Sequence, residues 1–428
     1  MLTVLLLSFF GSMFFSVPIA LAISGSSILA MELFGRVNPY FFANQVFSGL
    51  NNFTMIALPF FMMAGALMQY GGVSRRLISF CKALVGWVPG SLGVVTVLAC
   101  MLFAAISGSG PATVVSIGMI MLPMMAEENY DMGYASSLVA MSGGLGVVIP
   151  PSLPMITYAT LVEGVSVGAM FMAGIIPGIL LGLAEIVFNV ILCKKRNMGI
   201  IIKERPTLKS LWAAFKDAFL ALMMPVIILG GIYGGLFTPT EAACVAVVYG
   251  FIVGVFVYKE INFATFKKIL VDSSVMAASA LFIIAMVDGF NFALTKQKVP
   301  IILSGFITST FGTKYAFVTA LAVLLLILGC FMSANAAIII LAPILGPIAA
   351  AMGYNLVQLG IVMIICLNIG MVTPPFGVHM FIASNITGVP IEKMFKYIWM
   401  LVGVAVIVLL LLIFIPELSL FLPMHMHN

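Results

Sequence analysis

The sequence predicts an all-α polytopic membrane protein, an inverted repeat with two re-entrant helical hairpins and two broken transmembrane helices. Three observations lead to this prediction. The composition is strongly apolar, two long apolar stretches are interrupted midway by small and polar residues, and the pattern of the first half recurs 224 residues later. Each predicted element follows from the order of the residues along the chain.

The composition excludes a soluble protein. Hydrophobic residues make up 63% of the 428 positions and charged residues 8%, whereas a soluble domain carries about 25% charge. Backbone groups in lipid must satisfy one another, so we expect helices. The apolar segments are far longer than the alternating segments of an outer-membrane barrel, which excludes that class. The net charge of +5 does not require a nucleic-acid partner to explain it. The basic residues lie at span ends, where membrane proteins generally carry them.

Ten apolar segments are long enough to span a membrane, which takes roughly 20 residues. They lie near 2–16, 18–34, 42–70, 133–163, 167–193, 216–236, 241–258, 266–295, 355–386 and 394–416. Two further stretches, about 92–127 and about 316–352, are broken at Ser107–Thr113 and Ser333–Ala336, and each predicts a re-entrant hairpin. No Lys or Arg precedes Arg36. A cleaved signal peptide needs a basic start, so we expect the first span to be retained.

The basic residues predict the orientation. The connector at 194–215 is rich in Lys and Arg, and we place it in the cytoplasm. With that choice 15 of the 19 basic residues are cytoplasmic, and only Arg36, Lys296, Lys298 and Lys314 are periplasmic. The opposite orientation would violate the positive-inside rule. Both termini are then periplasmic.

The two repeats occupy 1–193 and 216–428, on either side of the connector. The strongest match is the Gly-x-x-x-Pro-Pro motif that begins at Gly146 and recurs at Gly370, because paired prolines inside a span are costly and rare. In the orientation above, the first hairpin opens to the cytoplasm and the second to the periplasm. The repeat is therefore inverted, as in many secondary transporters.

The broken spans, 133–163 and 355–386, predict cation sites. Each Pro-Pro removes N–H groups and frees carbonyls, and such backbone survives at membrane depth only where it is buried or lines a cavity. Carbonyls beside hydroxyls suit Na⁺; the alternative is a kink that serves packing alone. We expect two sodium sites: Ser107, Gly146, Ile149 and Ser152 form the first, and Gly329, Ser333, Gly370 and Thr373 form the second.

The hairpin tips predict an anion site. Half-helix N-termini at a tip suit a carboxylate, although small residues at a tip also serve close helix packing. Basic residues are scarce within the spans, so an anion must rely on hydroxyl, amide and N–H groups. The expected substrate-binding residues are Ser107, Ser109, Ser152, Ser333 and Asn335. No motif of a catalytic or nucleotide-binding kind occurs, so we expect no enzyme activity, no cofactor and no metal other than the coupling Na⁺.

Other titratable residues in apolar segments have less specific meanings. Glu185, Glu241 and Asp288 lie within or at the ends of such segments, where charge is expensive and often functional. Glu241 follows Thr238 at a helix start and is expected to be mainly structural. Asp288 could be an ion-pair partner of Lys296 or Lys298 or a solvated span end, and His379 is expected to serve packing.

Four motifs resemble those of a known family. The segments Pro59–Gly65, Gly108–Thr113, Ile149–Ser152 and Thr238–Ala243 resemble signatures of the large membrane subunit of TRAP (tripartite ATP-independent periplasmic) transporters. The resemblance covers essentially the whole chain. It implies a bacterial inner-membrane protein that takes up an organic acid with Na⁺ by an elevator-type mechanism, in an architecture similar to the ion transporter superfamily.

The resemblance also implies two partners and a range of substrates. The partners are a small four-helix membrane subunit, expected as a separate chain, and a periplasmic substrate-binding protein. Similarity around Gly108–Thr113 to sialic-acid-type members favours sialic acid, with C4-dicarboxylates next. The family often has an acidic residue where this chain has Ser333, which leaves any charged contact at that position in doubt. The alternatives are a Na⁺/dicarboxylate symporter that needs no binding protein and a membrane scaffold that does not transport.

An elevator mechanism requires a moving body and a static frame. We expect the body to hold both hairpins and both broken spans. We expect the frame to comprise the spans near 18–34, 167–193, 241–258 and 394–416, which lack polar breaks. The small subunit should dock on this frame, and the binding protein should meet the periplasmic basic residues.

Overall fold

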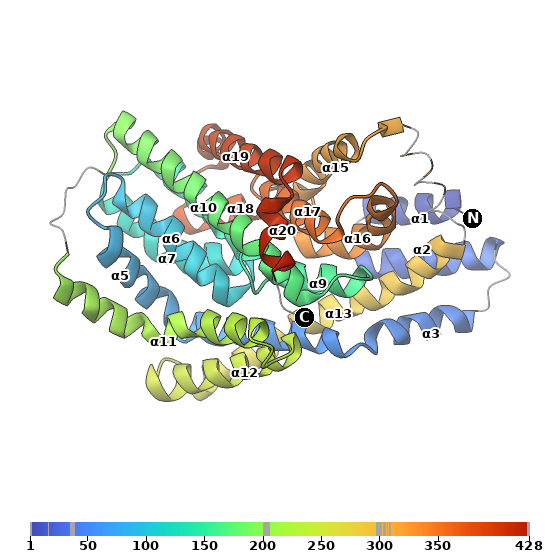
Figure 1. The fold of residues 1–428 in the computed structure, drawn as a ribbon, viewed down its shortest axis with the longest axis horizontal. Coiled ribbons are helices and arrows are strands. Elements are labelled where there is room, and N and C mark those ends of the chain that lie inside the picture. Colours follow the sequence, from blue (N-terminus) through green and yellow to red (C-terminus); the bar gives the residue numbers. More distant parts are fainter. Residues whose placement is uncertain are drawn as a thin grey trace.

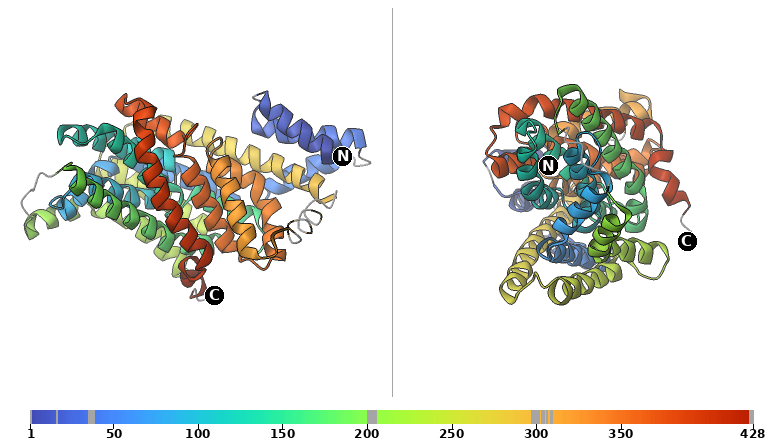
Figure 2. Two further views of the ribbon diagram at one scale, coloured as in Figure 1. Left: turned by 90° about the horizontal axis from the view of Figure 1, so that it is seen from above. Right: turned by 90° about the vertical axis from the view of Figure 1, so that its left-hand side faces the viewer.

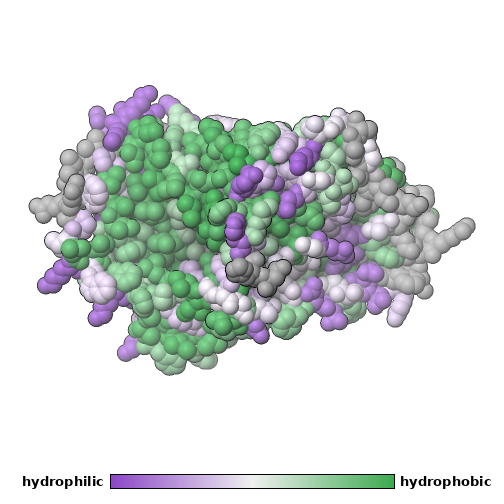
Figure 3. Space-filling model, viewed as in Figure 1, coloured by the Kyte–Doolittle hydropathy of each residue, from purple (hydrophilic) through white to green (hydrophobic). Residues whose placement is uncertain are grey.

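The computed structural model describes residues 2–15, 17–34, 39–199, 206–296 and 310–425, together with 302, 305 and 307. Over these residues the regular secondary structure is entirely helical. Eight of the described helices are long and apolar enough to cross a membrane, and four shorter apolar helices accompany them. Most helices run along the long axis of the molecule (Figure 1). Hydrophobic residues cover much of the face in Figure 3, with hydrophilic residues near the ends of that axis and in a strip at the centre.

The N-terminal elements precede the first hairpin. They are α1 (Leu2–Phe14), α2 (Ile19–Phe34), α3 (Pro39–Leu50), η1 (Phe53–Ile56), α4 (Ala57–Tyr70) and α5 (Val73–Val85). The prediction of one span over 42–70 is wrong, because the chain breaks between α3 and α4. Asn52 starts the short 3₁₀ turn by accepting a hydrogen bond from the Thr54 N–H at 2.9 Å. Helix α5 was not predicted.

The first hairpin and broken span follow. Helices α6 (Ser91–Ser107) and α7 (Gly110–Glu127) form the hairpin; α8 (Met132–Gly143), η2 (Gly144–Val147) and α9 (Leu153–Leu161) form the broken span, and α10 (Val167–Arg196) ends this half. Both elements lie where the sequence predicts them. Asp131 caps α8 through hydrogen bonds from the N–H groups of Gly133 and Tyr134.

The second half begins after the connector, of which 200–205 lie outside the described residues. Its elements are α11 (Leu208–Tyr233), α12 (Pro239–Ile252), η3 (Val253–Val257), α13 (Phe263–Lys296), α15 (Lys314–Gly329), α16 (Ala334–Ala351), α17 (Leu356–Gly370), α18 (Val378–Thr387), α19 (Ile391–Phe414) and α20 (Glu417–Met424). Helix α11 starts eight residues before the predicted span at 216–236. The predicted second hairpin and second broken span are present as α15–α16 and α17–α18.

The repeat is visible in the packing. Helices α7 and α16 have the same bounds after a shift of 224 residues, and α10 and α19 start at the same shift. The second helix of each hairpin packs against the second half of the opposite broken span: α7 lies on α18, and α16 lies on α9. The two hairpins approach the centre from opposite ends of the long axis (Figure 1). This arrangement agrees with an inverted repeat.

The helices fall into two groups by their contacts. Helices α2, α3, α4, α12 and α13 pack on one another, and α11 joins them through α5 and α12. Helix α10 packs on α6, α9 and α17, and α19 packs on α8 and α17. The end-on view in Figure 2 places α11–α13 on one side of the molecule and α19 on the other. The segments 167–193 and 394–416 were expected in the frame, but by these contacts they group with the hairpins and broken spans. We call α6–α10 and α15–α20 the body and the remaining described helices the frame.

Candidate functional site

The tip of the first hairpin is fixed against the first break. Gly108 ends α6 with φ of 60°, a left-handed conformation that favours glycine. Its carbonyl oxygen accepts a hydrogen bond from the Leu153 N–H at 3.3 Å. The Ser107 Oγ lies 3.0 Å from the Thr113 Oγ1, which donates to the Ser109 carbonyl oxygen at 2.8 Å. The tip therefore presents several oxygen atoms next to the break.

Gly146 lies against this group of oxygens. An ideal Cβ built on Gly146 would be 2.5 Å from the Ser109 carbonyl oxygen and 2.6 Å from the Thr113 Oγ1. Ser152 is buried, and its hydroxyl donates to the Val147 carbonyl oxygen at 2.6 Å. The structure thus brings together three of the four residues predicted for the first sodium site. Sequence reasoning missed Thr113, although it belongs to the motif at this tip.

Ile149, the fourth of these residues, has its side chain directed elsewhere. An ideal Cβ on Gly178 of α10 would be 2.5 Å from the Ile149 Cγ1, so this side chain packs against α10. Only the backbone carbonyl of Ile149 remains for an ion. The sequence had predicted that backbone carbonyls before each Pro-Pro pair would bind the cation, and the Ile149 carbonyl is one of them.

The second set of predicted ion ligands divides in two. Gly329 and Gly370 are in close contact, since an ideal Cβ on Gly329 would be 3.0 Å from the Gly370 Cα. The Thr373 N–H donates to the Gly370 carbonyl oxygen at 2.9 Å, and its hydroxyl donates to the Ile369 carbonyl oxygen at 2.7 Å, which leaves the hydroxyl lone pairs available. Ser333 instead caps α16 by accepting from the Ala336 N–H at 3.3 Å, and its side chain is exposed.

A cavity of about 200 Å³ lies between the two tips and the two breaks. Three pairs of its lining residues are related by the repeat: Ser109 with Ser333, Pro111 with Asn335, and Val147 with Met371. The cavity therefore surrounds the pseudo-twofold axis, and we call it the axial pocket. Met62 of α4 and Met276 of α13 also line it, so the pocket lies between the body and the frame.

The axial pocket contains three of the five predicted substrate-binding residues. Ser109, Ser333 and Asn335 line it, whereas Ser107 and Ser152 do not. Those two serines are buried behind the wall and use their hydroxyls in the hydrogen bonds described above. The described residues that line the pocket include no charged side chain. The Asn335 Oδ1 has no hydrogen-bond partner among the described residues, which leaves this oxygen available to a ligand.

Two buried polar side chains lie next to the site: Asn368 had no predicted role, and His379 was expected to serve packing. Asn368 lies against Gly144, since an ideal Cβ on Gly144 would be 2.8 Å from the Asn368 Cγ. Positions 144 and 368 are repeat mates, so this contact lies on the pseudo-twofold axis. His379 lies against Gly110 at the first tip, and neither of its ring nitrogens has a hydrogen-bond partner. In the sequence, each of these two residues stands out only as a single polar residue in an apolar segment.

The remaining titratable residues have mixed outcomes. Glu241 forms a capping box with Thr238, which confirms its structural role. Asp288 of α13 lies against Gly49 of α3, and the described side chains form no ion pair with it. Of the basic residues expected to face the periplasm, Arg36, Lys298 and the side chain of Lys296 lie outside the described residues.

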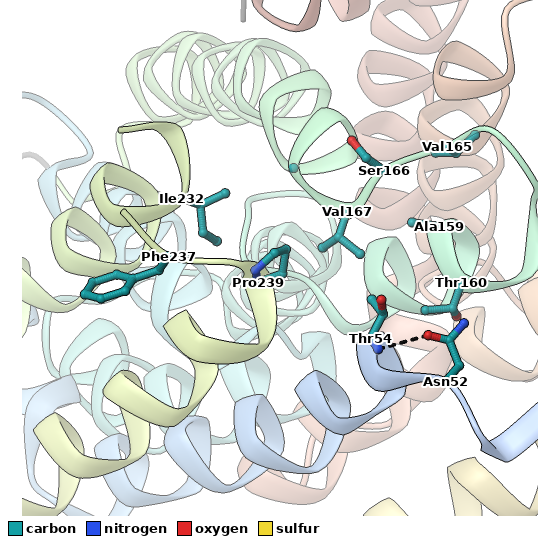
Figure 4. Close-up of a pocket in the computed structure, with 11 residues that line it drawn as sticks. Asn52, Thr54, Ala159, Thr160, Val165, Ser166, Val167, Ile232, Phe237 and Pro239 are labelled. Carbon is teal, nitrogen blue, oxygen red and sulfur yellow. Dashed lines mark hydrogen bonds between the residues drawn. The ribbon is translucent and has the colours of Figure 1, made fainter. Parts of the chain in front are cut away.

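A second cavity, of about 370 Å³, lies at the boundary between the frame and the body (Figure 4). Its walls come from η1, the α9–α10 turn and the α11–α12 turn. Asn52, Thr160 and Ser166 supply polar groups, and Phe237 and Pro239 close the frame side. None of the predicted site residues lines it. Frame and body are thus not closely packed here.

Comparison with known proteins places the chain in a family. The family model described as the DctM component of tripartite ATP-independent periplasmic transporters matches residues 6–418. The isethionate TRAP transporter permease protein DctMQ of Oleidesulfovibrio alaskensis is 39% identical over 95% of this chain, which spans 64% of that longer protein. The C4-dicarboxylate large permease DctM of Pseudomonas aeruginosa is 39% identical over 94% of this chain and 93% of its own length.

Two further matches extend the comparison. The sialic acid large permease SiaM of Vibrio cholerae is 33% identical over 96% of each chain. The crystal structure of the Alcanivorax borkumensis YdaH transporter has a TM-score of 0.64 with 12% identity, over 92% of this chain and 95% of that one, and supports the fold alone. The family match covers nearly the whole chain. The protein is thus a multi-pass membrane protein of the DctM family, the large permease component of a tripartite ATP-independent periplasmic transporter.

Proposed function

We propose that this permease takes up a small organic acid anion together with Na⁺ and binds the anion in the axial pocket. The observation that supports this most directly is the set of three repeat-related residue pairs round one cavity. A site on the pseudo-twofold axis is available to both halves of an inverted repeat, as alternating access requires. The N-termini of α7 and α16 start at this pocket and offer N–H groups and positive partial charge to a carboxylate or sulfonate.

The size of the pocket favours a small anion. Cavities for drug-sized ligands measure about 300–1,000 Å³, and the axial pocket is smaller, at about 200 Å³. A sialic acid is of drug size, whereas isethionate and C4-dicarboxylates, named for the relatives from O. alaskensis and P. aeruginosa, are much smaller. The volume of the axial pocket therefore favours these smaller acids. It does not favour sialic acid, which the sequence resemblance at Gly108–Thr113 suggested.

Sodium coupling rests on the two breaks. At the first break the carbonyl of Ser109 and the hydroxyls of Ser107 and Thr113 converge beside Gly146. At the second, the Thr373 hydroxyl lies next to the close contact of Gly329 and Gly370. Hydroxyl and carbonyl oxygens without a carboxylate suit a monovalent hard cation. Each proposed ion site touches a hairpin tip, so an ion bound there would stabilise the tip that contacts the anion.

Large permeases of this family work in general with a small membrane subunit and a periplasmic binding protein. For this chain we propose that the small subunit docks on the frame and that the binding protein delivers the anion. An elevator movement of the body against the frame would then carry the pocket across the membrane. The methionines Met62 and Met276 offer an apolar frame surface against which the body can slide.

Uptake into proteoliposomes tests the proposal. The permease, reconstituted with its small subunit, should accumulate labelled isethionate or a C4-dicarboxylate only with an inward Na⁺ gradient and a purified binding protein. Ser109→Ala with Asn335→Ala should reduce uptake, while the exposed Ser210→Ala should not. Uptake without a binding protein would favour the self-sufficient symporter, and the absence of any Na⁺-dependent flux would favour the scaffold. Unchanged uptake by the double variant would place the substrate elsewhere.

A further inference from the structure

Glu185 is a buried carboxyl in the middle of the body. It lies on α10 with 2% of its surface exposed. The Ser142 hydroxyl of α8 donates to its Oε2 at 2.5 Å, and within the described part of the chain its Oε1 has no hydrogen-bond partner. Nothing in the proposed sodium sites or in the axial pocket uses this residue. A buried, half-satisfied carboxyl in a membrane helix is expensive and needs an explanation.

Among the described residues, no basic side chain forms an ion pair with Glu185. The ion pairs among the described residues involve Arg76 alone. Cys100 of α6 and Tyr134 of α8 are titratable groups near Glu185, and both are neutral in their ordinary forms. The titratable groups on the other elements packed against α10 are Tyr158 (α9), Cys366 (α17), Glu392, Lys393, Lys396 and Tyr397 (α19), Glu417 (α20) and His425 just after α20. The basic residues of α10 itself lie in its last turn, at Lys194–Arg196, more than two turns beyond Glu185.

A metal ion fits this place poorly. The described residues contain no group of three or more acidic, histidine or cysteine side chains that could hold one. A single hydroxyl, that of Ser142, approaches the carboxyl, whereas Na⁺ requires several oxygen ligands. A proton needs one lone pair. The neutral acid also removes the cost of an isolated charge in apolar surroundings.

The location links Glu185 to the first break. Its partner Ser142 is two residues before Gly144, where α8 gives way to the 3₁₀ turn η2. One turn further along α10, the Asn189 side chain donates to the Gly90 carbonyl oxygen and accepts from the Tyr134 hydroxyl. This ties the start of α6 to α8. A change of charge at Glu185 would therefore act on α8 and on the turn η2 that follows it, which contains Gly146 of the first proposed ion site.

We propose that the Glu185 carboxyl is a proton-binding site of the body, and that its proton crosses the membrane with the anion as a second coupling ion. Coupling rests on the proposed transport function; proton binding itself does not. The proton is taken from periplasmic water onto a Glu185 oxygen and released from the same oxygen to cytoplasmic water. The body then returns with the carboxylate, and the cost of an isolated charge in apolar surroundings favours uptake of a new proton once Glu185 again faces periplasmic water.

Two measurements test this inference. Infrared difference spectra of the complete permease complex, on raising the pH, should lose a carboxylic acid carbonyl band that is absent in Glu185→Gln. In proteoliposomes with an external pH dye, wild-type uptake should remove protons from the outside and should fall as the external pH rises. Glu185→Gln, which mimics the protonated form, should lose both the proton movement and the pH dependence. The exposed Glu163→Gln should retain both.

The outcomes separate this inference from the proposed function. Na⁺-driven uptake without proton movement in the wild type would refute the second coupling ion and leave the proposed function intact. Proton movement and pH dependence that persist in Glu185→Gln would also refute it. Absence of the Glu185 band refutes proton binding whether or not uptake occurs. If Glu185→Gln fails to fold, the spectra and flux of Ser142→Ala decide, because loss of the hydroxyl donor should shift the band and the pH profile together.

Discussion

A methyl group at Gly146 should separate the first hairpin tip from the first break. The ideal Cβ would be 2.5 Å from the Ser109 carbonyl oxygen, about 0.9 Å short of the 3.4 Å at which ordinary contact begins. The obstructing atom is backbone, so no side chain can rotate away. Overpacking of this kind costs about 1–3 kcal/mol. If the cost falls on the ion-bound geometry, the apparent Na⁺ affinity should fall by about 5- to 150-fold.

The repeat provides a second test of the same reasoning. In Gly370→Ala the new Cβ would lie 2.5 Å from the Gly329 Cα, so this variant should weaken Na⁺ dependence to a similar extent. Gly403→Ala is the matched control, because nothing lies within 4 Å of the Cβ it would add. The assay is the Na⁺ concentration for half-maximal uptake, with thermal unfolding in detergent measured alongside.

The pattern across the three variants decides the outcome. Weaker Na⁺ dependence with near-normal thermal stability would show that the tip–break contact serves ion binding. Lower stability with an unchanged Na⁺ titration would show a packing role alone. If Gly146→Ala changes neither quantity, the close approach of tip and break is unimportant in the functioning protein and the reasoning from the sterics is refuted.

Three further predictions follow from the same site. Thr373→Ala should raise the Na⁺ concentration for half-maximal uptake about fivefold, because a lost neutral hydroxyl contact is worth about 1 kcal/mol; an unchanged titration would exclude this hydroxyl as a ligand. Asn335→Ala should weaken anion binding in isothermal titration without altering Na⁺ dependence, and equal loss of both would contradict separate sites. A cysteine pair at Met276 and Ala334, in a background without native cysteines, should block uptake reversibly when crosslinked across the axial pocket; full crosslinking with normal uptake would refute an elevator.

The tips and breaks were predictable because their signals are local. A left-handed turn at Gly108 needs glycine, and a Pro-Pro pair cannot continue a helix. The structure accordingly starts α7 at Gly110 and α16 at Ala334, next to the predicted interruptions. A few neighbouring residues determine these helix ends, so they could be predicted without knowing the tertiary packing.

The grouping of helices was not predictable in the same way. Helix α19 is apolar on nearly every face, so its pattern carries no period to show which side meets protein and which meets lipid. For that reason the sequence did not show that this helix packs with the hairpins and broken spans. Helix α5 was missed because it is short and amphipathic, with basic residues at Arg75, Arg76 and Lys82. A search for long apolar runs does not detect such a helix.

Side-chain direction at the site was also beyond the sequence. Ser107 and Ser109 are two residues apart at the same tip, yet the first is buried toward Thr113 and the second lines the axial pocket. The motif indicates which polar groups gather at a tip. The turn conformation decides which of them face the ligand, and that depends on the contact with the opposite break.

The grouping of α10 and α19 with the hairpins changes where the proposed movement and the proposed docking of the small subunit would occur. With α10 and α19 in the body, the body meets the frame mainly through α4, α5 and α13. At that surface Gly65 of α4 approaches the Ser107 backbone so closely that an ideal Cβ would be 2.9 Å from its carbonyl oxygen, and Met62 and Met276 reach the axial pocket. A glycine presents no side chain, and methionine adapts its shape to changing contacts. A small subunit that must stay bound through the cycle therefore has to attach away from this surface, on the outer faces of α2, α3, α11 and α12, where contact survives the movement.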